Sequence, residues 1–200
     1  MKNLLIILTI CIIAFSCQED NFHKTGLHNG IHDKTMLEYL QSDSYNWDST
    51  VLVIQRAGLE ELFSGNDPDH PQITFLGCTN LSILRYLLLN NYNKISDIPE
   101  DQCKELILNH VISGRLIKDD IPMGIETPKS GGKDYTTLGG AKVWMYNYTE
   151  PVGNIRGAGA TILFLESYDF DKRWDIASSN IQTNTGIVHS LEYAYIFGEL

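Results

Sequence analysis

The apolar residues of this chain change their spacing near Arg115, and this change constrains the fold more than any other feature. Before Arg115 they recur every three or four residues, which is the spacing of one helical face. After it, short runs rich in β-branched and aromatic residues are separated by glycines, a pattern typical of strands joined by turns. Because the helices come first and the strands later, the sequence predicts an α+β fold, with helices packed on one end or face of an antiparallel sheet.

The first half of the chain contains several helix signals. Thr35 and Glu38 make a capping box ahead of an apolar run, so a short helix is expected to begin there. A second helix is expected from Asp48 as N-cap to Gly58, with another helical turn at 59–63. The motif Asp48-Ser49-Thr50 also resembles an acceptor for O-glycosylation, and the sequence leaves that question open.

The next segment combines a strand with two further helices. The run 73–76 predicts a strand, after which Thr79 and Asn80 cap an apolar helix. Another helix is expected from Pro99 to Gly114, because proline suits a first helical turn. Its apolar stripe places His110 toward the core and comprises Cys103, Leu106, Ile107, His110 and Val111.

The second half predicts strands at 135–138, 141–148, 160–166 and 186–197. The glycine-rich segment 153–159 is expected to be a hairpin turn, because a phosphate-binding loop opens a helix and the residues that follow have strand character. The segment 118–134 is expected to be an exposed loop. In the strand 186–197, His189 alternates with Ile187 and Leu191, so it is expected to be a structural residue inside the fold.

Composition restricts the classes of partner. The chain has 200 residues with a net charge of −10, which disfavours nucleic-acid binding. Hydrophobic residues make up 43% of it, enough to bury a core in one domain. The sequence indicates no cofactor.

The N-terminus indicates export. Lys2 precedes an uncharged apolar run at 4–15, which is too short to span ~30 Å of hydrocarbon and matches a signal peptide. The residues Ala14-Phe15-Ser16-Cys17 resemble the lipobox of bacterial lipoproteins, so Cys17 is expected to be lipidated. The alternative is an ordinary signal peptide with a chance cysteine. Removing residues 1–16, which contain one lysine, leaves a net charge of −11.

We therefore expect a signal peptide at 1–16, a lipidated tether at 17–34 and a single domain at 35–200. The acidic pair Glu19-Asp20 resembles the signal that sends lipoproteins of Bacteroides-like bacteria to the cell surface, which predicts a surface-exposed anchor in the outer membrane. In the tether, His28 and His32 have the spacing of a helical metal pair, but Gly26 and Gly30 disfavour a helix, so no metal site is predicted.

Four segments in order resemble the fasciclin domain family: 73–80 (ITFLGCTN), 109–111 (NHV), 137–140 (TLGG) and 185–189 (TGIVH). The resemblance covers about 36–200 and implies a wedge-shaped antiparallel β-sandwich with flanking helices. It also implies structural roles for the motif residues Thr74, Thr79, Asn80, His110, Gly140, Gly186 and His189. The chain departs from the family pattern at Cys78, Asn109, Thr185 and Glu192, where the family has proline, tyrosine, asparagine and aspartate.

The resemblance implies a non-catalytic adhesion or recognition module at the cell surface, with a protein or glycan partner. The alternatives are an accessory role in an outer-membrane nutrient-uptake system, which rests on analogy, and a hydrolase built from Cys78, Cys103, His110 and His189. The apolar context of Cys103 and His110 argues against catalysis. Whether Cys78 and Cys103 pair is left open.

A ligand site is expected in two places. The segment 154–179 is longer than the usual family connection, and there Arg173 and Trp174 offer charge and stacking to a polar ligand. The alternative is that Trp174 fills the end of the sandwich. An aromatic platform for sugar is the second possibility, formed by Trp144, Tyr146, Tyr148 and Trp174, although aromatic residues in strands are usually core or cross-strand pairs.

Overall fold

The computed structural model describes residues 30–200, and its elements confirm the predicted α+β class. Helices predominate in the first part of the chain, and the longest strands follow. The α-helices are α2 (Met36–Gln41), α3 (Ser44–Arg56), α4 (Glu60–Phe63), α5 (Asn80–Leu89) and α6 (Glu100–Leu108), and the 3₁₀ turns are η1 (Ile95–Asp97) and η2 (Lys118–Asp120).

The main sheet is mixed, with the strand order β2-β1-β9-β8-β7-β6-β5. Its strands are β1 (Ile73–Gly77), β2 (Val111–Ser113), β5 (Lys133–Thr136), β6 (Lys142–Thr149), β7 (Thr161–Ser167), β8 (Lys172–Thr183) and β9 (Gly186–Leu191). A separate hairpin joins β3 (Gly124–Ile125) to β4 (Ser130–Gly131). The sequence predicted an antiparallel sheet, and one pair of strands differs from this prediction, because β1 and β9 pair in parallel.

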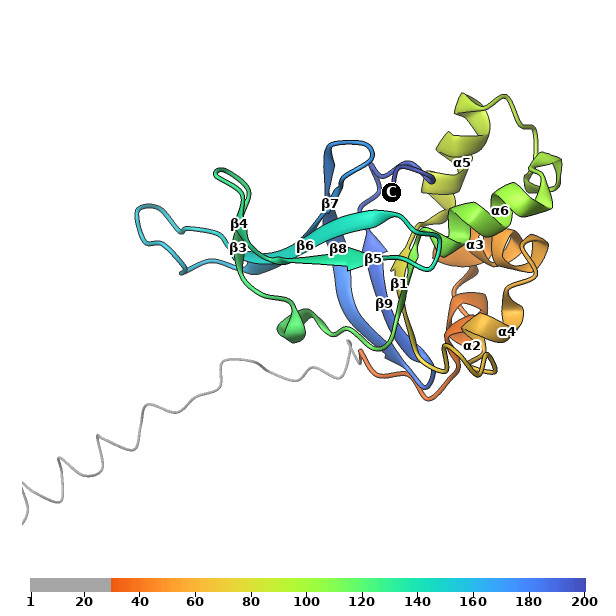
Figure 1. Cartoon of the computed structure of the whole chain (residues 1–200), viewed down its shortest axis with the longest axis horizontal. Coiled ribbons are helices and arrows are strands. Elements are labelled where there is room, and N and C mark those ends of the chain that lie inside the picture. The colour runs from red at the N-terminus through yellow and green to blue at the C-terminus, as the bar shows by residue number, and fades with distance from the viewer. Residues whose placement is uncertain (1–29) are drawn as a thin grey trace, which may run out of the picture.

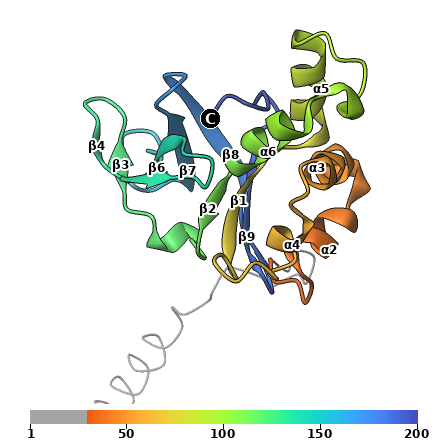
Figure 2. The same ribbon diagram turned by 45° about the vertical axis from the view of Figure 1, so that its right-hand side comes forward.

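The strand β8 joins the two halves of the sheet. Its first residues pair with β7, up to Asp175, and its residues from Ile176 onward pair with β9. The register with β9 shifts on both sides of Ser178, the kind of irregularity that lets a strand bend from one sheet into the next. As a result, β5, β6 and β7 lie on one side of β1 and β9, and the helices lie on the other (Figures 1 and 2).

This arrangement explains which residues are buried. The central strands β1 and β9 are buried along their whole lengths, because both of their faces are covered. On β6 and β7, alternate residues point into the same core, among them Val143, Met145, Leu163 and Leu165. The residues between them are left on the outer face of the sheet.

The predicted helix at Thr35 is confirmed, including its capping box with Glu38. The predicted start of the next helix is wrong. Its N-cap is Asp43, whose carboxylate accepts a hydrogen bond from the Asn46 N–H, and Asp48 lies inside α3. The physical reason is the buried Trp47, which extends the apolar face of the helix to a point before Asp48.

The motif Asp48-Ser49-Thr50 therefore lies within a helix. Thr50 is fully buried, and its hydroxyl donates to the carbonyl of Cys78. The threonine of this motif is consequently not exposed in the folded domain.

The helix α6 ends at Leu108, not at Gly114 as expected. The residues after it form β2, which pairs antiparallel with β1, and the carbonyl of His110 accepts from the N–H of Leu76. Strand pairing has thus replaced the last predicted helical turn. His110 still reaches the core, but from the connection between α6 and β2.

The segment 154–179, which was expected to be an unusually long connection, consists mostly of strands. It contains β7 and the first part of β8, which pair antiparallel with each other. The segment 153–159 is the turn of a hairpin, as predicted, because β6 and β7 pair on either side of it. At the other end of the chain, Gly30 and His32 exchange backbone hydrogen bonds with Gln182 of β8, so contacts with the sheet begin before residue 35.

Candidate functional site

Three aromatic rings form a row on the outer face of the sheet, and we call them the aromatic row. Trp144 and Tyr146 alternate along β6, and Phe164 of β7 lies directly opposite Tyr146. The ring centroids of Trp144 and Tyr146 are 4.1 Å apart, and those of Tyr146 and Phe164 are 5.3 Å apart. These rings form a cluster separate from the main core. Of the four residues considered for an aromatic platform, Trp144 and Tyr146 belong to this row, and they pack together as the alternative of paired aromatic residues in strands describes.

The β3–β4 hairpin covers part of this row, and two glycines permit the close approach. A Cβ added at Gly124 would lie 2.6 Å from the Cβ of Tyr146, and one added at Gly132 would lie 2.4 Å from the indole nitrogen of Trp144. Gly132 also has a φ of +60°, which other residues rarely adopt. The row is almost fully buried as a result, with Trp144 and Tyr146 only 3% and 2% exposed.

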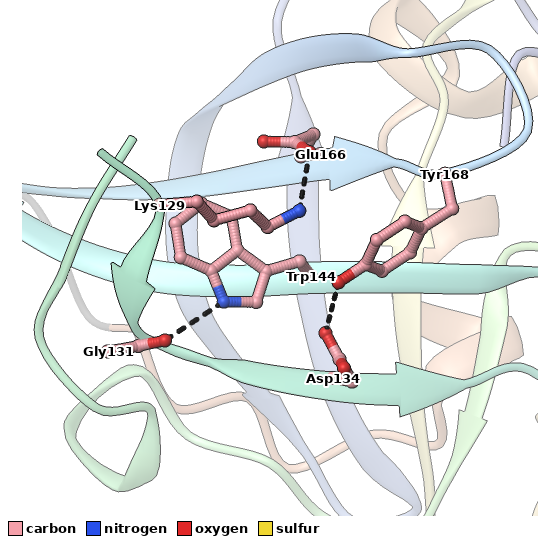
Figure 3. A network of polar contacts seen from close by, with 6 residues as sticks. All are labelled: Lys129, Gly131, Asp134, Trp144, Glu166 and Tyr168. Carbon is pink, nitrogen blue, oxygen red and sulfur yellow. Dashed lines mark hydrogen bonds and ion pairs between the residues drawn. The ribbon is translucent and has the colours of Figure 1, made fainter. Parts of the chain in front are cut away.

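A polar network fastens the hairpin to the sheet (Figure 3). The ammonium of Lys129 lies 2.6 Å from a carboxylate oxygen of Glu166, and 4.5 Å and 4.2 Å from the ring centroids of Trp144 and Tyr168. The indole N–H of Trp144 donates to the Gly131 carbonyl, and the Tyr168 hydroxyl donates to Asp134. The network thus combines an ion pair, two cation–π contacts and two hydrogen bonds.

Beside the row is a cavity of about 310 Å³, which we call the Arg173 pocket. Its walls combine aromatic, acidic and basic groups and are formed by Ile125, Glu126, Thr127, Tyr146, Tyr148, Glu150, Phe164 and Arg173. Its volume is at the lower end of the range for small-ligand sites, ~300–1,000 Å³. The pocket draws on the β3–β4 hairpin and on three neighbouring strands of the sheet.

Arg173 is the central charge of this pocket. Its guanidinium lies 2.6 Å from a carboxylate oxygen of Glu126 and 4.8 Å from the ring centroid of Phe164. Burial raises the pKa of the nearby Tyr146 phenol, Glu126 raises it further, and Arg173 opposes the rise. Tyr146 therefore stays a neutral phenol at physiological pH. The pocket offers a planar cation, two carboxylates and aromatic rings, which are groups that hold a polar ligand in a fixed orientation.

Arg173 and Trp174 do not share a site, contrary to the expectation for this pair. Trp174 lies opposite Leu165, so it occupies the core side of β8, whereas Arg173 lies opposite Glu166 on the outer side. The Trp174 ring packs edge-to-face on Tyr195, with centroids 5.2 Å apart. The position of Trp174 therefore agrees with the alternative interpretation, in which its side chain fills the end of the sandwich.

Both motif histidines are buried and hydrogen-bonded through both ring nitrogens. Nδ1 of His110 is 2.7 Å from the Leu106 carbonyl, so it carries the proton, and Nε2 accepts from the Tyr195 hydroxyl at 2.6 Å. In His189, Nε2 donates to the Leu116 carbonyl and Nδ1 accepts from the Asn180 N–H. Burial lowers the pKa of each histidine to about 4.

The two cysteines have the environment of core residues. Cys78 and Cys103 are both free thiols and fully buried. Burial raises the pKa of Cys78 to about 12, and burial likewise raises that of Cys103. A protonated thiol is a poor nucleophile, and the histidines already use both nitrogens, so these side chains lack the chemistry of a thiolate and its base.

The remaining motif residues hold elements together. The Thr74 hydroxyl donates to the Gly114 carbonyl and accepts from the Leu116 N–H. Asn80 joins α5 to α3, because its side chain accepts from the Ser49 N–H and donates to the carbonyls of Ser44 and Tyr45. Gly140 lies in the turn between β5 and β6, and Gly186 begins β9. Thr79 is the N-cap of α5, but its side chain makes no capping bond.

Several predictions concern residues before Gly30. The signal peptide at 1–16, the lipidation of Cys17, the acidic pair Glu19-Asp20 and His28 of the disfavoured metal pair lie outside the described residues. Within 30–200, no three His, Cys, Asp or Glu side chains are grouped so that they could hold a metal ion. In the same range, no helix combines the length and the apolar character that a membrane crossing requires.

Sequence reasoning missed Glu126, Lys129 and Glu166. Glu126 and Lys129 lie in a segment that was expected to be a plain exposed loop, and their importance depends on where the β3–β4 hairpin folds. The available signal was the pair Gly131-Gly132, which together with Gly124 marks a place where backbone approaches another group closely.

Comparisons with known proteins find similarity to solved structures. The chain is similar to a structure described as a FAS1 domain pair from the insect cell adhesion molecule Fasciclin I, with a TM-score of 0.45 and 14% sequence identity. The match covers 82% of this chain and 46% of that chain, so this chain spans about half the length of that protein. No family model matches the sequence, and no curated protein matches it.

Proposed function

We propose that the protein is a cell-surface lipoprotein whose folded domain is a non-catalytic adhesion or recognition module. The observation that carries the proposal is the Arg173 pocket, which offers aromatic rings and charged groups at the surface of the sheet. The partner, a glycan or a protein, contacts Arg173, Tyr148 and the two glutamates of the pocket. Phe164 of the aromatic row packs against Tyr146 and lies 4.8 Å from the Arg173 guanidinium.

The non-catalytic part of the proposal is supported by the cysteines and histidines. The pKa of Cys78, at about 12, keeps its thiol protonated, and the neutral histidines are held by backbone and tyrosine partners inside the core. The surface location is supported by the resemblance of residues 14–17 to a lipobox and by the acidic pair that follows.

Partner binding is tested with a glycan array and with pull-down from an outer-membrane extract, using the wild type and Arg173→Ala. We expect saturable binding without turnover by the wild type and at least a tenfold loss in the variant. Lys104→Ala, which removes a positive charge from the exposed side of α6, is the matched control and should bind normally. Full binding by Arg173→Ala, or chemical change in the bound partner, contradicts the proposal.

Anchoring is tested separately with Cys17→Ser. We expect the variant to be released into the medium or to remain unprocessed, whereas the wild type partitions into the detergent phase and incorporates a labelled fatty acid. Unchanged partitioning and labelling of the variant would refute the role of Cys17 as the lipid anchor.

A further inference from the structure

A second cavity of about 310 Å³ lies between the helices and the sheet, away from the aromatic row. It is bordered by α2, α3, the start of α5 and the part of β8 and β9 where their register shifts. Ser178 and Ile181, which flank the irregular pairing on β8, line one wall. We call this cavity the cap pocket, because Asp43 and Thr79, the N-caps of α3 and α5, both line it.

Two polar groups in the walls of the cap pocket have no hydrogen-bond partner among the described residues. They are the indole nitrogen of Trp47 and the hydroxyl of Thr79, whose residues are only 3% and 4% exposed. The benzene side of the Trp47 ring packs against Gly77, so its nitrogen edge is on the opposite side. Thr79 occupies an N-cap position but makes no capping bond, which leaves its hydroxyl available.

Buried donors without partners are uncommon in native proteins, because each retains the full penalty of desolvation. Burial raises the pKa of the Tyr39 phenol and Asp43 raises it further, whereas the nearby Trp47 indole opposes the rise. The contact between the indole and this phenol does not have the geometry of a hydrogen bond, so the Trp47 N–H lacks a full partner. A ligand with an oxygen acceptor would satisfy the indole N–H, and the same ligand would accept from or donate to the Thr79 hydroxyl.

The charge of the pocket restricts the ligand further. Asp43 is the one ionisable carboxylate in the walls, and its oxygens already accept from the backbone and side chain of Asn46. None of the lining residues is basic, and the whole chain has a net charge of −10, so an anion is disfavoured. The ring of Tyr193 and the hydroxyls of Ser178 and Ser190 complete a wall of aromatic and neutral polar groups.

We propose that the cap pocket binds a neutral hydroxylated molecule about the size of one sugar ring. The ligand oxygens occupy the positions facing Trp47 and Thr79, and its apolar face lies against Tyr39 or Tyr193. This site is distinct from the Arg173 pocket, with which it shares no lining residue, and it does not depend on the function proposed there.

The experiment follows the indole N–H signals of the protein by ¹H–¹⁵N NMR. The chain has 3 tryptophans, so each signal is assigned from its single Trp→Phe variant. The probes are the methyl glycosides of glucose, galactose, mannose and N-acetylglucosamine, with glucuronic acid and glucosamine as charged comparators. Free reducing sugars in a parallel series distinguish a free monosaccharide from the end of a glycan.

We expect at least one neutral sugar to shift the Trp47 signal saturably, while the signals of Trp144 and Trp174 stay in place. Tighter binding of a charged comparator, a shift at Trp144 in place of Trp47, or no saturable shift with any probe overturns the proposal. The last result would mean that the pocket holds only water.

Variants separate a ligand site from a merely structural cavity. Thr79→Val removes the hydroxyl but keeps the shape, so it should bind about tenfold more weakly while its melting temperature is unchanged or higher. Ser82→Ala is the matched control, because the Ser82 hydroxyl is also buried without a partner but does not line the pocket. Arg173→Ala should also keep the Trp47 response. Equal affinity of Thr79→Val and wild type contradicts the inference.

Discussion

Lowering the pH should destabilise the folded protein through its two buried histidines. In the native state His110 and His189 have a pKa of about 4, because burial disfavours the charged ring. In the unfolded chain both return to about 6.5. The folded state therefore binds fewer protons between these values, so its stability is fully present above pH 6.5 and is lost as the pH falls toward 4.

The magnitude follows from the size of the shift. A change of one pKa unit corresponds to about 1.4 kcal/mol, so each histidine contributes about 3 kcal/mol that is lost at and below pH 4. Together they account for about 6 to 7 kcal/mol, which is comparable to the whole stability of many domains, about 5–15 kcal/mol. Between pH 6 and 4.5 the free energy of unfolding should therefore fall by about 2 to 2.5 kcal/mol per pH unit.

The assay is urea unfolding of the purified protein at intervals from pH 8 to pH 4.5. We expect a nearly constant free energy of unfolding above pH 7 and a decline below 6.5. His110→Gln and His189→Gln should each reduce stability at pH 7.5 and also reduce the slope by about half. His70→Gln is the control, because the His70 ring lies near the surface, where its Nδ1 is hydrogen-bonded to the Ser113 hydroxyl. A free energy that stays constant from pH 7 to 5 would refute the reasoning.

Three further predictions concern contacts outside the histidines. Asn80→Ala should lower the free energy of unfolding by about 2–3 kcal/mol in urea denaturation, because it leaves the carbonyls of Ser44 and Tyr45 and the Ser49 N–H without their shared partner. Lys129→Met should lower the free energy of unfolding by about 1 kcal/mol, because it removes the cation that fastens the hairpin to the sheet. It should also make residues 123–132 more sensitive to limited proteolysis, and unchanged cleavage there would contradict this role. Cys78 and Cys103 should react with a thiol reagent only on unfolding, and a native mass lower by two protons would instead show a disulfide.

Local signals in the sequence predicted the elements whose chemistry is contained within a few residues. The capping box of Thr35 and Glu38 is present, the strand at 73–76 became β1, and the hairpin around 153–159 formed between β6 and β7. In each case the residues that define the structure are close together in the chain. The α+β class follows from the same local patterns.

The elements that the sequence did not predict depend on distant partners. The strand β8 contains many polar residues, and its irregular pairing with β9 breaks the alternation that identifies a strand. The end of α6 is set by the pairing of β2 with β1, which lies well before it in the chain. The parallel pairing of β1 and β9 joins segments from opposite ends of the domain, so no local pattern contains it.

The same limit applies to the candidate site. Arg173 and Trp174 are adjacent in the chain, and adjacent residues of a strand point to opposite faces of the sheet, so at most one of them belongs to any one pocket. Which of the two faces outward depends on the register of β8 with β7, where Trp174 lies opposite the buried Leu165. A shift of one residue would exchange their roles.

The bend of β8 has a consequence for both pockets. Up to Asp175 this strand pairs with β7 and supplies Arg173 to the Arg173 pocket, and from Ile176 onward it pairs with β9 and supplies Ser178 and Ile181 to the cap pocket. A strand with regular pairing would keep the same partner strand along its whole length, and it would leave no gap of the kind found around Ser178. The irregularity that hides β8 from sequence analysis is therefore also what places one strand in the walls of two separate cavities.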